Sequence, residues 1–358
     1  MPVSINRNLL PKELIRLNML VCLLCALASV CTQAYAQAPY TFTTFSVPNS
    51  TYTNPYAISE GGYVTGRYGL ADGYAGFVRT PSGTIGTISF PGARTTAAGG
   101  MNRFGVIAGN YGNAVSPVGG FFYYKGAYGN AVIDGQPAFV IDSNDYGYYV
   151  GNYGGPTAVT GFVASPSGEV TVLQYPGACC TYPYWIKNDG EVAGAYQDQI
   201  GGLHAFVWNA RSGYRTISIP GVPKAQIFDI NANRTMVGTY INGPAVHGFV
   251  YQKCMFRIVE PPGANGSSIS AIDNKGQLVG DYTVPGSTSM GFIATPVRLA
   301  RQKRGPTANA CHHQWRDPSE GTGSRRSATP GRSARLAQRS GQPRKANALA
   351  AGRRAIRH

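Results

Sequence analysis

The sequence predicts an all-β fold made of six tandem copies of one four-stranded unit between about residues 37 and 296. Three observations support this fold class. A Gly-x-Tyr tripeptide recurs every 42 to 44 residues, a Gly-Phe or Ala-Phe pair follows each copy, and a Pro-Gly turn ends most copies. Composition agrees, because 47 Gly and 24 Pro with only 13% charged residues are typical of short strands joined by tight turns.

The first two markers keep a nearly constant distance from one another in all copies. The tripeptides begin at Gly66, Gly109, Gly151, Gly194, Gly238 and Gly280. The aromatic residues of the second marker are Phe77, Phe121, Phe162, Phe206, Phe249 and Phe292. A period of this kind over the whole region indicates tandem structural repeats, and the repeated Tyr and Phe residues are expected to build the core between them.

The fifth copy shows the pattern of one unit most clearly. Alternating or apolar segments lie at 225–230, 236–240, 247–251 and 257–259, with turn residues between them. Gly ends the first hairpin turn in most other copies, where a positive φ is expected. Units of 40 to 50 residues with four antiparallel strands are typical of propeller blades. The sequence therefore predicts a six-bladed β-propeller over 37–296.

The two ends of the repeat region complement each other. The last copy stops after its third strand, at 290–295, whereas the segment 40–47 matches the pattern of a fourth strand and precedes the first copy. Pairing these segments completes the last blade and removes two open sheet edges. We therefore expect the N-terminal strand to close the last blade.

The unit resembles a known repeat family. Asp229-Ile-Asn231, Gly238-Thr-Tyr240 and His247-Gly-Phe249 follow its pattern, and the tripeptide that names the family is present as His204-Ala-Phe206. On these motifs the chain resembles the HAF-type extracellular repeat family over about 260 residues. The resemblance implies export and a repeat architecture, but no catalytic or ligand residues. The first motif varies in the second, third and fourth copies.

The first 36 residues predict an export signal. Three basic residues precede an apolar run over 17–31, and Ala34 and Ala36 supply small residues before a cleavage site. The alternatives are an uncleaved anchor and a lipoprotein modified at Cys31, but the run is shorter than the ~20 residues that span a bilayer. We expect a secreted protein, periplasmic or extracellular, with no transmembrane span after signal removal.

The net charge of +15 comes mainly from the C-terminal end. After Val297, fifteen Lys and Arg residues accompany two acidic residues, whereas 37–297 holds thirteen of each sign. The residues 297–358 predict a basic, disordered tail, because they contain few apolar residues and no repeat marker. The tail either binds an anionic polymer or the cell envelope, or is an extension without a role. No specific nucleic-acid partner is expected of the neutral repeats.

Few residues suggest chemistry. His204 and His247 occupy equivalent positions in neighbouring copies and are expected to form structural hydrogen bonds. The Asx-rich segments 142–147, 229–233 and 273–276 resemble parts of calcium loops, but they fall at hairpin turns, where such side chains cap their own backbone. The cysteines outside the signal form neither a zinc motif nor a disulfide framework. The sequence thus predicts no catalytic, cofactor-binding or metal residues and no cofactor.

Two functions remain open. The favoured one is a non-catalytic binding or surface-structural module whose varied hairpin loops, such as 113–117 and 198–202, recognise an extracellular or envelope ligand, a glycan or a protein. The alternative is a propeller enzyme, a lyase or glycosidase, with acids such as Asp142, Asp229 and Asp273 at the channel mouth. Recurrence of these acids with the repeat favours binding, because chemistry needs residues that differ between copies.

Overall fold

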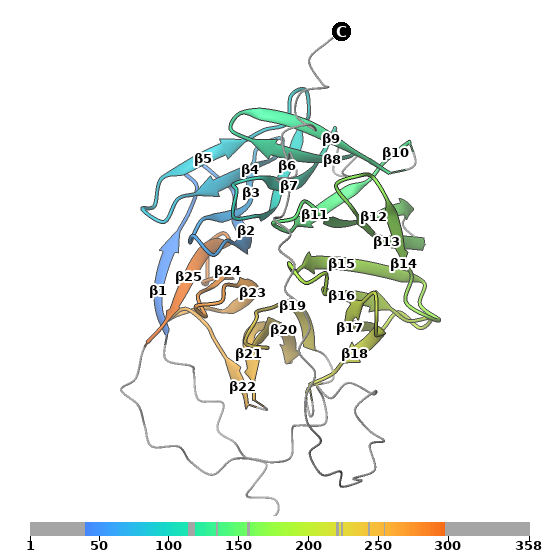
Figure 1. Ribbon diagram of the computed structural model, residues 1–358. Coiled ribbons are helices and arrows are strands. Elements are labelled where there is room, and N and C mark those ends of the chain that lie inside the picture. The colour runs from blue at the N-terminus through green and yellow to red at the C-terminus, as the bar shows by residue number, and fades with distance from the viewer. Residues whose placement is uncertain are drawn as a thin grey trace, which may run out of the picture. The chain divides into compact units, whose positions relative to one another are not determined.

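The computed structural model describes most of the repeat region. The described residues are 40–113, 119–133, 135–155, 158–219, 222, 225–242, 244–253 and 255–297. They form twenty-five β-strands, and no helix occurs among them (Figure 1). The chain divides into two compact units, Met1–Cys311 and His312–His358, and every described residue belongs to the first. The predicted all-β fold is confirmed.

The strands follow one another in antiparallel groups, one group for each sequence repeat. Repeats one and two contain β2 (Thr53–Ile58), β3 (Val64–Leu70), β4 (Gly73–Arg79), β5 (Ile85–Ile88), β6 (Thr95–Met101), β7 (Ile107–Gly112), β8 (Gly119–Tyr124) and β9 (Ala127–Ile133). The short strand β10 (Gln136–Pro137) pairs with β9. Repeats three and four contain β11 (Phe139–Ser143), β12 (Tyr149–Gly155), β13 (Ala158–Ala164), β14 (Val170–Leu173), β15 (Cys180–Ile186), β16 (Val192–Gln197), β17 (Leu203–Asn209) and β18 (Gly213–Ile217).

The last two repeats have the same strand order. They contain β19 (Ala225–Ile230), β20 (Met236–Asn242), β21 (Ala245–Gln252), β22 (Met255–Ile258), β23 (Gly266–Ile272), β24 (Leu278–Thr283) and β25 (Met290–Pro296). A single parallel pair, Tyr74 with Thr95, joins the first two repeats into one sheet. Val159 and Cys180 join the third and fourth in the same way. Apart from these two residue pairs, the described strands of the six repeats pair only with strands of their own repeat or with β1 or β10.

The N-terminal strand pairs with the end of the repeat region. β1 (Tyr40–Phe45) lies antiparallel to β25, from Tyr40 opposite Pro296 to Phe45 opposite Gly291. The sheet order is β1-β25-β24-β23, so a strand from the start of the chain occupies the fourth position of the last repeat. The pairing that the sequence predicted is therefore present, and Figure 1 shows β1 beside β25.

The repeated Phe residues form the core of the repeats. Each lies on the third strand of its repeat and is at most 1% exposed: Phe77, Phe121, Phe162, Phe206, Phe249 and Phe292. The Gly of the Gly-x-Tyr tripeptide makes room for this ring, since a Cβ on Gly151 would lie 2.9 Å from Phe162 and collide with the backbone of Phe139. Both sequence markers thus serve one packing arrangement. The expected role in the core is confirmed for Phe, whereas of the six Tyr residues of the tripeptides only Tyr68, Tyr240 and Tyr282 are buried.

The hairpin turns between the first and second strands also follow the sequence prediction. Asn144 Oδ1 accepts hydrogen bonds from the backbone N–H groups of Tyr146 and Tyr148, both at 3.0 Å. Gly147 ends this turn with φ of 81°. The Gly residues predicted at the equivalent turns have φ between 80° and 85°: Gly62, Gly105, Gly190 and Gly276. The Asx-rich segments therefore cap turns, as expected.

Several predictions fall outside the described residues. These are the export signal over 1–36, the tail after Val297, most of the loop at 113–117, and Cys254 and Cys311. Cys179 and Cys180 are both free thiols. A search of the described residues finds no helix with the length and hydropathy of a membrane span.

Candidate functional site

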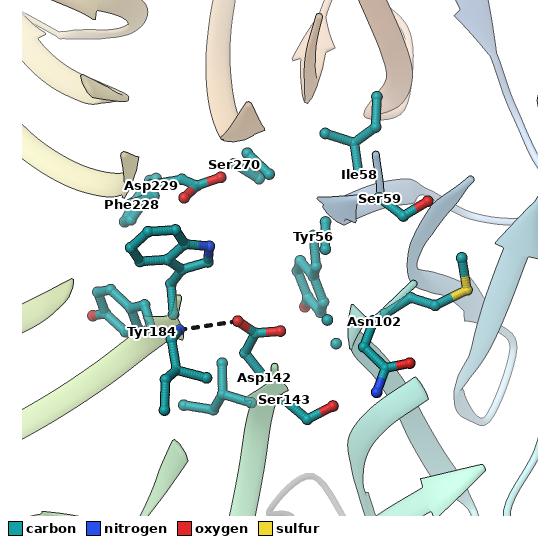
Figure 2. A pocket seen from close by; sticks show the side chains of 18 of the residues that line it. Tyr56, Ile58, Ser59, Asn102, Asp142, Ser143, Tyr184, Phe228, Asp229 and Ser270 are labelled. Atoms are coloured by element: carbon teal, nitrogen blue, oxygen red, sulfur yellow. Dashed lines mark hydrogen bonds between the residues drawn. The ribbon is translucent and has the colours of Figure 1, made fainter. Parts of the chain in front are cut away.

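The first strands of all six repeats line one cavity. Its volume is about 690 Å³, and its walls come mainly from β2, β6, β11, β15, β19 and β23. Three residues on second strands, Arg67, Asn110 and Asp281, extend the lining. Figure 2 shows side chains from several of these strands around the cavity. A ligand in this cavity would contact residues that are far apart in the sequence.

A β-bulge in the first strand brings a residue of each repeat into this lining. The ladder between the first and second strands shifts at Tyr56, Ile141, Tyr184, Phe228 and Ser270, each of which lacks a partner in the second strand. In β6 the irregularity spans Gly99 and Gly100. A bulge redirects a side chain, and bulges are common beside functional sites. The bulge positions are equivalent, yet their residue types differ from repeat to repeat.

Three aromatic side chains from the fourth and fifth repeats form one part of the wall, here called the aromatic wall: Tyr184, Trp185 and Phe228. Tyr56 lines the cavity from the first repeat. The rings of Tyr184 and Phe228 meet edge to face, with centroids 6.1 Å apart. Burial raises the pKa of Tyr184 to about 12, so its hydroxyl is neutral. These four residues were not anticipated, because they lie outside the repeated markers. The sequence did contain one signal that could have identified them. Each lies on the first strand of its repeat, either three residues before the following turn (Tyr56, Tyr184 and Phe228) or two residues before it (Trp185).

Two carboxylates occupy one equivalent position in the third and fifth repeats. Asp142 Oδ2 accepts a hydrogen bond from Ile186 N at 3.1 Å, shown in Figure 2, and Asp229 Oδ2 accepts one from Ile272 N at 2.9 Å. Each bond joins a repeat to the next. The other repeats have Ala57, Gly100, Trp185 and Ala271 at this position.

Burial changes the acidity of both carboxylates. Asp229 is buried, and Asp142 keeps only a part of its surface open to the cavity. Removal from water raises the pKa of each carboxyl group to about 7, although backbone N–H donors oppose the shift. Gly100 provides space for Asp142, because the carboxylate lies where a Cβ on Gly100 would be.

Asp273 does not join these two acids, contrary to the grouping that the sequence suggested. It lies two positions further along its repeat, where its Oδ1 accepts hydrogen bonds from Lys275 N at 2.9 Å and Gln277 N at 2.7 Å. Asp273 therefore caps a turn, and it is not among the residues lining the cavity. At the position of Asp142 and Asp229, a carboxylate occurs in only two of the repeats, which overturns the argument that these acids recur with the unit.

The other predicted polar residues have structural contacts. His204 Nε2 lies 2.8 Å from Asp198 Oδ2, and His247 Nδ1 lies 2.8 Å from Glu260 Oε1. The expectation of structural hydrogen bonds at both histidines is confirmed. The loop at 198–202 does not line the cavity. Within the described ranges, no group of three or more His, Cys, Asp or Glu side chains is arranged to hold a metal ion.

Comparison with solved structures finds similar chains of low identity. The chain is similar to AofleA from Arthrobotrys oligospora, with 12% identity over 73% of this chain and 89% of that one and a TM-score of 0.50. It is also similar to streptogramin B lyase, with 11% identity over 71% and 97% of the two chains and a TM-score of 0.44. The β-propeller domain of the Trilobed protease from Pyrococcus furiosus shares 6% identity over 68% and 94%, with a TM-score of 0.40.

These likenesses concern the fold alone. No protein-family model matches the chain, and no curated protein matches it in sequence. The successive antiparallel groups of strands, one for each sequence repeat, and the pairing of β1 with β25 are typical of β-propeller proteins. An assignment of function within this class depends on the cavity itself.

Proposed function

We propose that the chain is an exported, six-bladed β-propeller of the HAF repeat type that binds a ligand in its central cavity without catalysis. The N-terminal strand completes the last blade, and the ring closes between the last and first repeats. Two contacts support closure: Asn274 N donates to Glu60 Oε1 at 3.1 Å, and Lys275 Nζ donates to the Glu60 carbonyl at 2.7 Å. The ligand is an extracellular or envelope component, a glycan or a protein, that presents a group of matching size.

One observation carries this proposal. The six repeats agree at positions that build their core, but they differ at the bulge and the position after it, where side chains face the cavity. If these side chains only packed against one another around a channel, the same residue types could recur in every repeat. A concave site with an apolar wall and a few convergent polar groups is typical of small-molecule binding.

Filling the cavity tests the proposal. Ser270 lies at a bulge on the cavity wall, so Ser270→Trp should occupy the space without disturbing a ladder. Val172→Trp on the exposed side of β14 is the matched control. A panel of sugars, amino sugars and small aromatic amines is screened by thermal shift against the full mature chain.

We expect members of the panel to raise the melting temperature of the parent protein and of Val172→Trp, but not of Ser270→Trp. Stabilisation that persists in Ser270→Trp would place binding elsewhere. A panel without any effect on the parent protein would contradict the proposal directly.

An enzyme is the second candidate. Its support is specific: two carboxyl groups from different repeats line one cavity, and burial raises the pKa of both to about 7, where general acid–base catalysis is efficient. Binding is favoured because both carboxylates already accept backbone hydrogen bonds that join repeats. Hydrolysis of chromogenic glycosides by the parent protein, abolished by Asp142→Asn, would establish the enzyme instead.

A further inference from the structure

The cavity contains two carboxylates without cationic partners. Among the described residues, neither Asp142 nor Asp229 forms an ion pair, and their hydrogen bonds come from backbone N–H groups. Buried carboxylates are ordinarily paired with a cation or neutralised, because an isolated buried charge is costly. A cation from outside the chain would supply the missing partner.

The basic side chains of the lining have other contacts. Lys187 Nζ lies 2.8 Å from Glu191 Oε1, and Arg103 Nε lies 3.6 Å from Asp145 Oδ2. Arg67 holds its guanidinium group over the ring of Tyr74, 4.7 Å from the centroid. Among the residues that the structure describes, no basic side chain therefore forms an ion pair with Asp142 or Asp229, although the charge of Lys187 lowers the pKa of Asp229.

A buried hydroxyl group provides a second, independent observation. Ser143 follows Asp142 in β11, lines the cavity and is only 6% exposed, yet its Oγ has no hydrogen-bond partner among the described residues. Four of the other repeats have Ile and one has Met at the equivalent position. A buried hydroxyl without a partner is costly unless a ligand or water satisfies it. Its oxygen can accept a hydrogen bond from an N–H donor.

We propose that the cavity binds an organic ammonium ion, with the charged group between Asp142 and Asp229 and the apolar body against the aromatic wall. This inference rests on the proposed binding function and specifies its ligand class. Carboxylates provide charge-assisted hydrogen bonds to an ammonium group, and aromatic faces attract cations. Trp185 already contacts one cation of the chain, since Lys187 Nζ lies 5.1 Å from the centroid of its ring. The cavity, at about 690 Å³, has room for a body the size of a phenyl ring.

The proposal predicts a pH dependence of binding. Ionisation of Asp142 and Asp229 favours the ammonium ion, so its affinity should rise as pH increases through about 7, where both carboxyl groups titrate. Charged groups nearby modify this titration: Asp145 acts on Asp142, and Lys187 and Asp142 act on Asp229. The remaining charged residues of the lining are Glu60, Arg67, Arg103 and Asp281.

Three probes that share one body test the inference. Phenethylammonium, 2-phenylethanol and 3-phenylpropionate differ chiefly in charge, and calorimetric titration measures their affinity for the full mature chain near pH 8. Phenethylammonium should bind at least about tenfold more tightly than the alcohol, and the propionate more weakly than either. Lowering the pH to about 5.5 should weaken phenethylammonium binding about tenfold and leave the alcohol unchanged.

Variants assign the effect to the cavity. Asp142→Asn and Asp229→Asn should each weaken phenethylammonium binding about tenfold, with little change for 2-phenylethanol. Asp72→Asn is the matched control, since Asp72 is an exposed acid outside the lining. Ser143→Ala, which keeps both carboxylates, should weaken the ammonium ion about threefold.

Equal affinity for phenethylammonium and 2-phenylethanol would overturn the ammonium inference but leave the binding function intact. Tighter binding of 3-phenylpropionate would do the same. Absence of binding by all three probes would overturn the inference, and the Ser270→Trp comparison then judges the binding function separately. The pH dependence of phenethylammonium affinity, measured on the parent protein, tests the inference even where a variant fails to fold.

Discussion

The third strand and the first strand of the repeat differ in how much their residue types vary from copy to copy. On the third strand all six repeats keep Phe, and each ring is almost fully buried. At the bulge of the first strand the repeats have Tyr, Gly, Ile, Tyr, Phe and Ser, and these residues line a shared cavity. The same residue is kept on the third strand because its surroundings between repeats are alike. The varied residues at the bulge of the first strand fit a binding site to which the repeats contribute different side chains.

The largest expected effect is on stability, and it distinguishes the Phe residues of the core from the aromatic residues that line the cavity. Phe162→Ala removes a side chain without exposed surface and should lower the free energy of unfolding by about 3–5 kcal/mol. Phe228→Ala removes a ring that faces the cavity and contacts Tyr184 at its edge, so the expected loss is about 1 kcal/mol. Denaturant unfolding of both variants measures the difference. Similar losses would show that the cavity wall is simply part of the core.

A second prediction concerns the pH dependence of stability. Burial raises the pKa of Asp142 and Asp229 from 3.8 to about 7, so the folded chain retains protons that the unfolded chain releases. Stability from these groups is complete below about pH 4 and is lost as pH rises through 7, by an amount on the order of a few kcal/mol for the pair.

Thermal unfolding without ligand between pH 4 and 8 measures this slope. Asp142→Asn should make it shallower, because one of the two titrating groups is gone. Stability that rises across this interval, with an unchanged slope in Asp142→Asn, would show that the cavity does not desolvate its acids.

Contacts between repeats give a smaller effect. Asn231 Oδ1 accepts hydrogen bonds from Asn233 N and Thr235 N, and its Nδ2 donates to the Asp273 carbonyl of the next repeat at 3.1 Å. Asn231→Ala should therefore cost about 2 kcal/mol of stability. Asn233→Ala removes only the longer, exposed bond from Asn233 Nδ2 to the Asn274 carbonyl, at 3.3 Å, and should cost less than about 0.5 kcal/mol. Equal costs would mean that burial of the Asn231 hydrogen bonds adds nothing measurable to stability.

The smallest expected effect concerns the basic end of the chain. A protein ending at Val297 should keep the melting temperature of the chain that retains the tail, because the core residues that the structure describes all precede this end. Affinity for heparin or anionic vesicles should disappear with the tail and, while present, weaken steeply with salt. Binding of equal strength without the tail would place the basic surface on the repeats.

The sequence predicted the parts of the fold that depend on repeated local chemistry. The spacing of Phe and Gly predicted the core, the Asx residues predicted capped turns, and the unmatched segment 40–47 predicted the pairing of β1 with β25. These features need only the pattern within a unit or a missing element at its end. Their physical causes are visible in the residue types themselves.

The candidate site was less accessible to sequence reasoning. A bulge shifts the register by one residue, so alternation alone does not show that Tyr184 and Trp185 both reach the cavity. Asp273 was grouped with Asp142 and Asp229 by residue type, although it lies at a different position of the unit. The hydrogen bond from Ile186 to Asp142 spans forty-four residues and becomes apparent only when the repeats are placed side by side.

A crystal structure of the full chain with phenethylammonium near pH 8 shows whether the cavity binds an ammonium ion at its carboxylates. We expect the ligand in the cavity, with its nitrogen about 3 Å from a carboxylate oxygen of Asp142 or Asp229 and its ring against the aromatic wall. A cavity that holds only water while the ligand occupies an outer surface, or a ligand with its nitrogen turned away from both carboxylates, would contradict it.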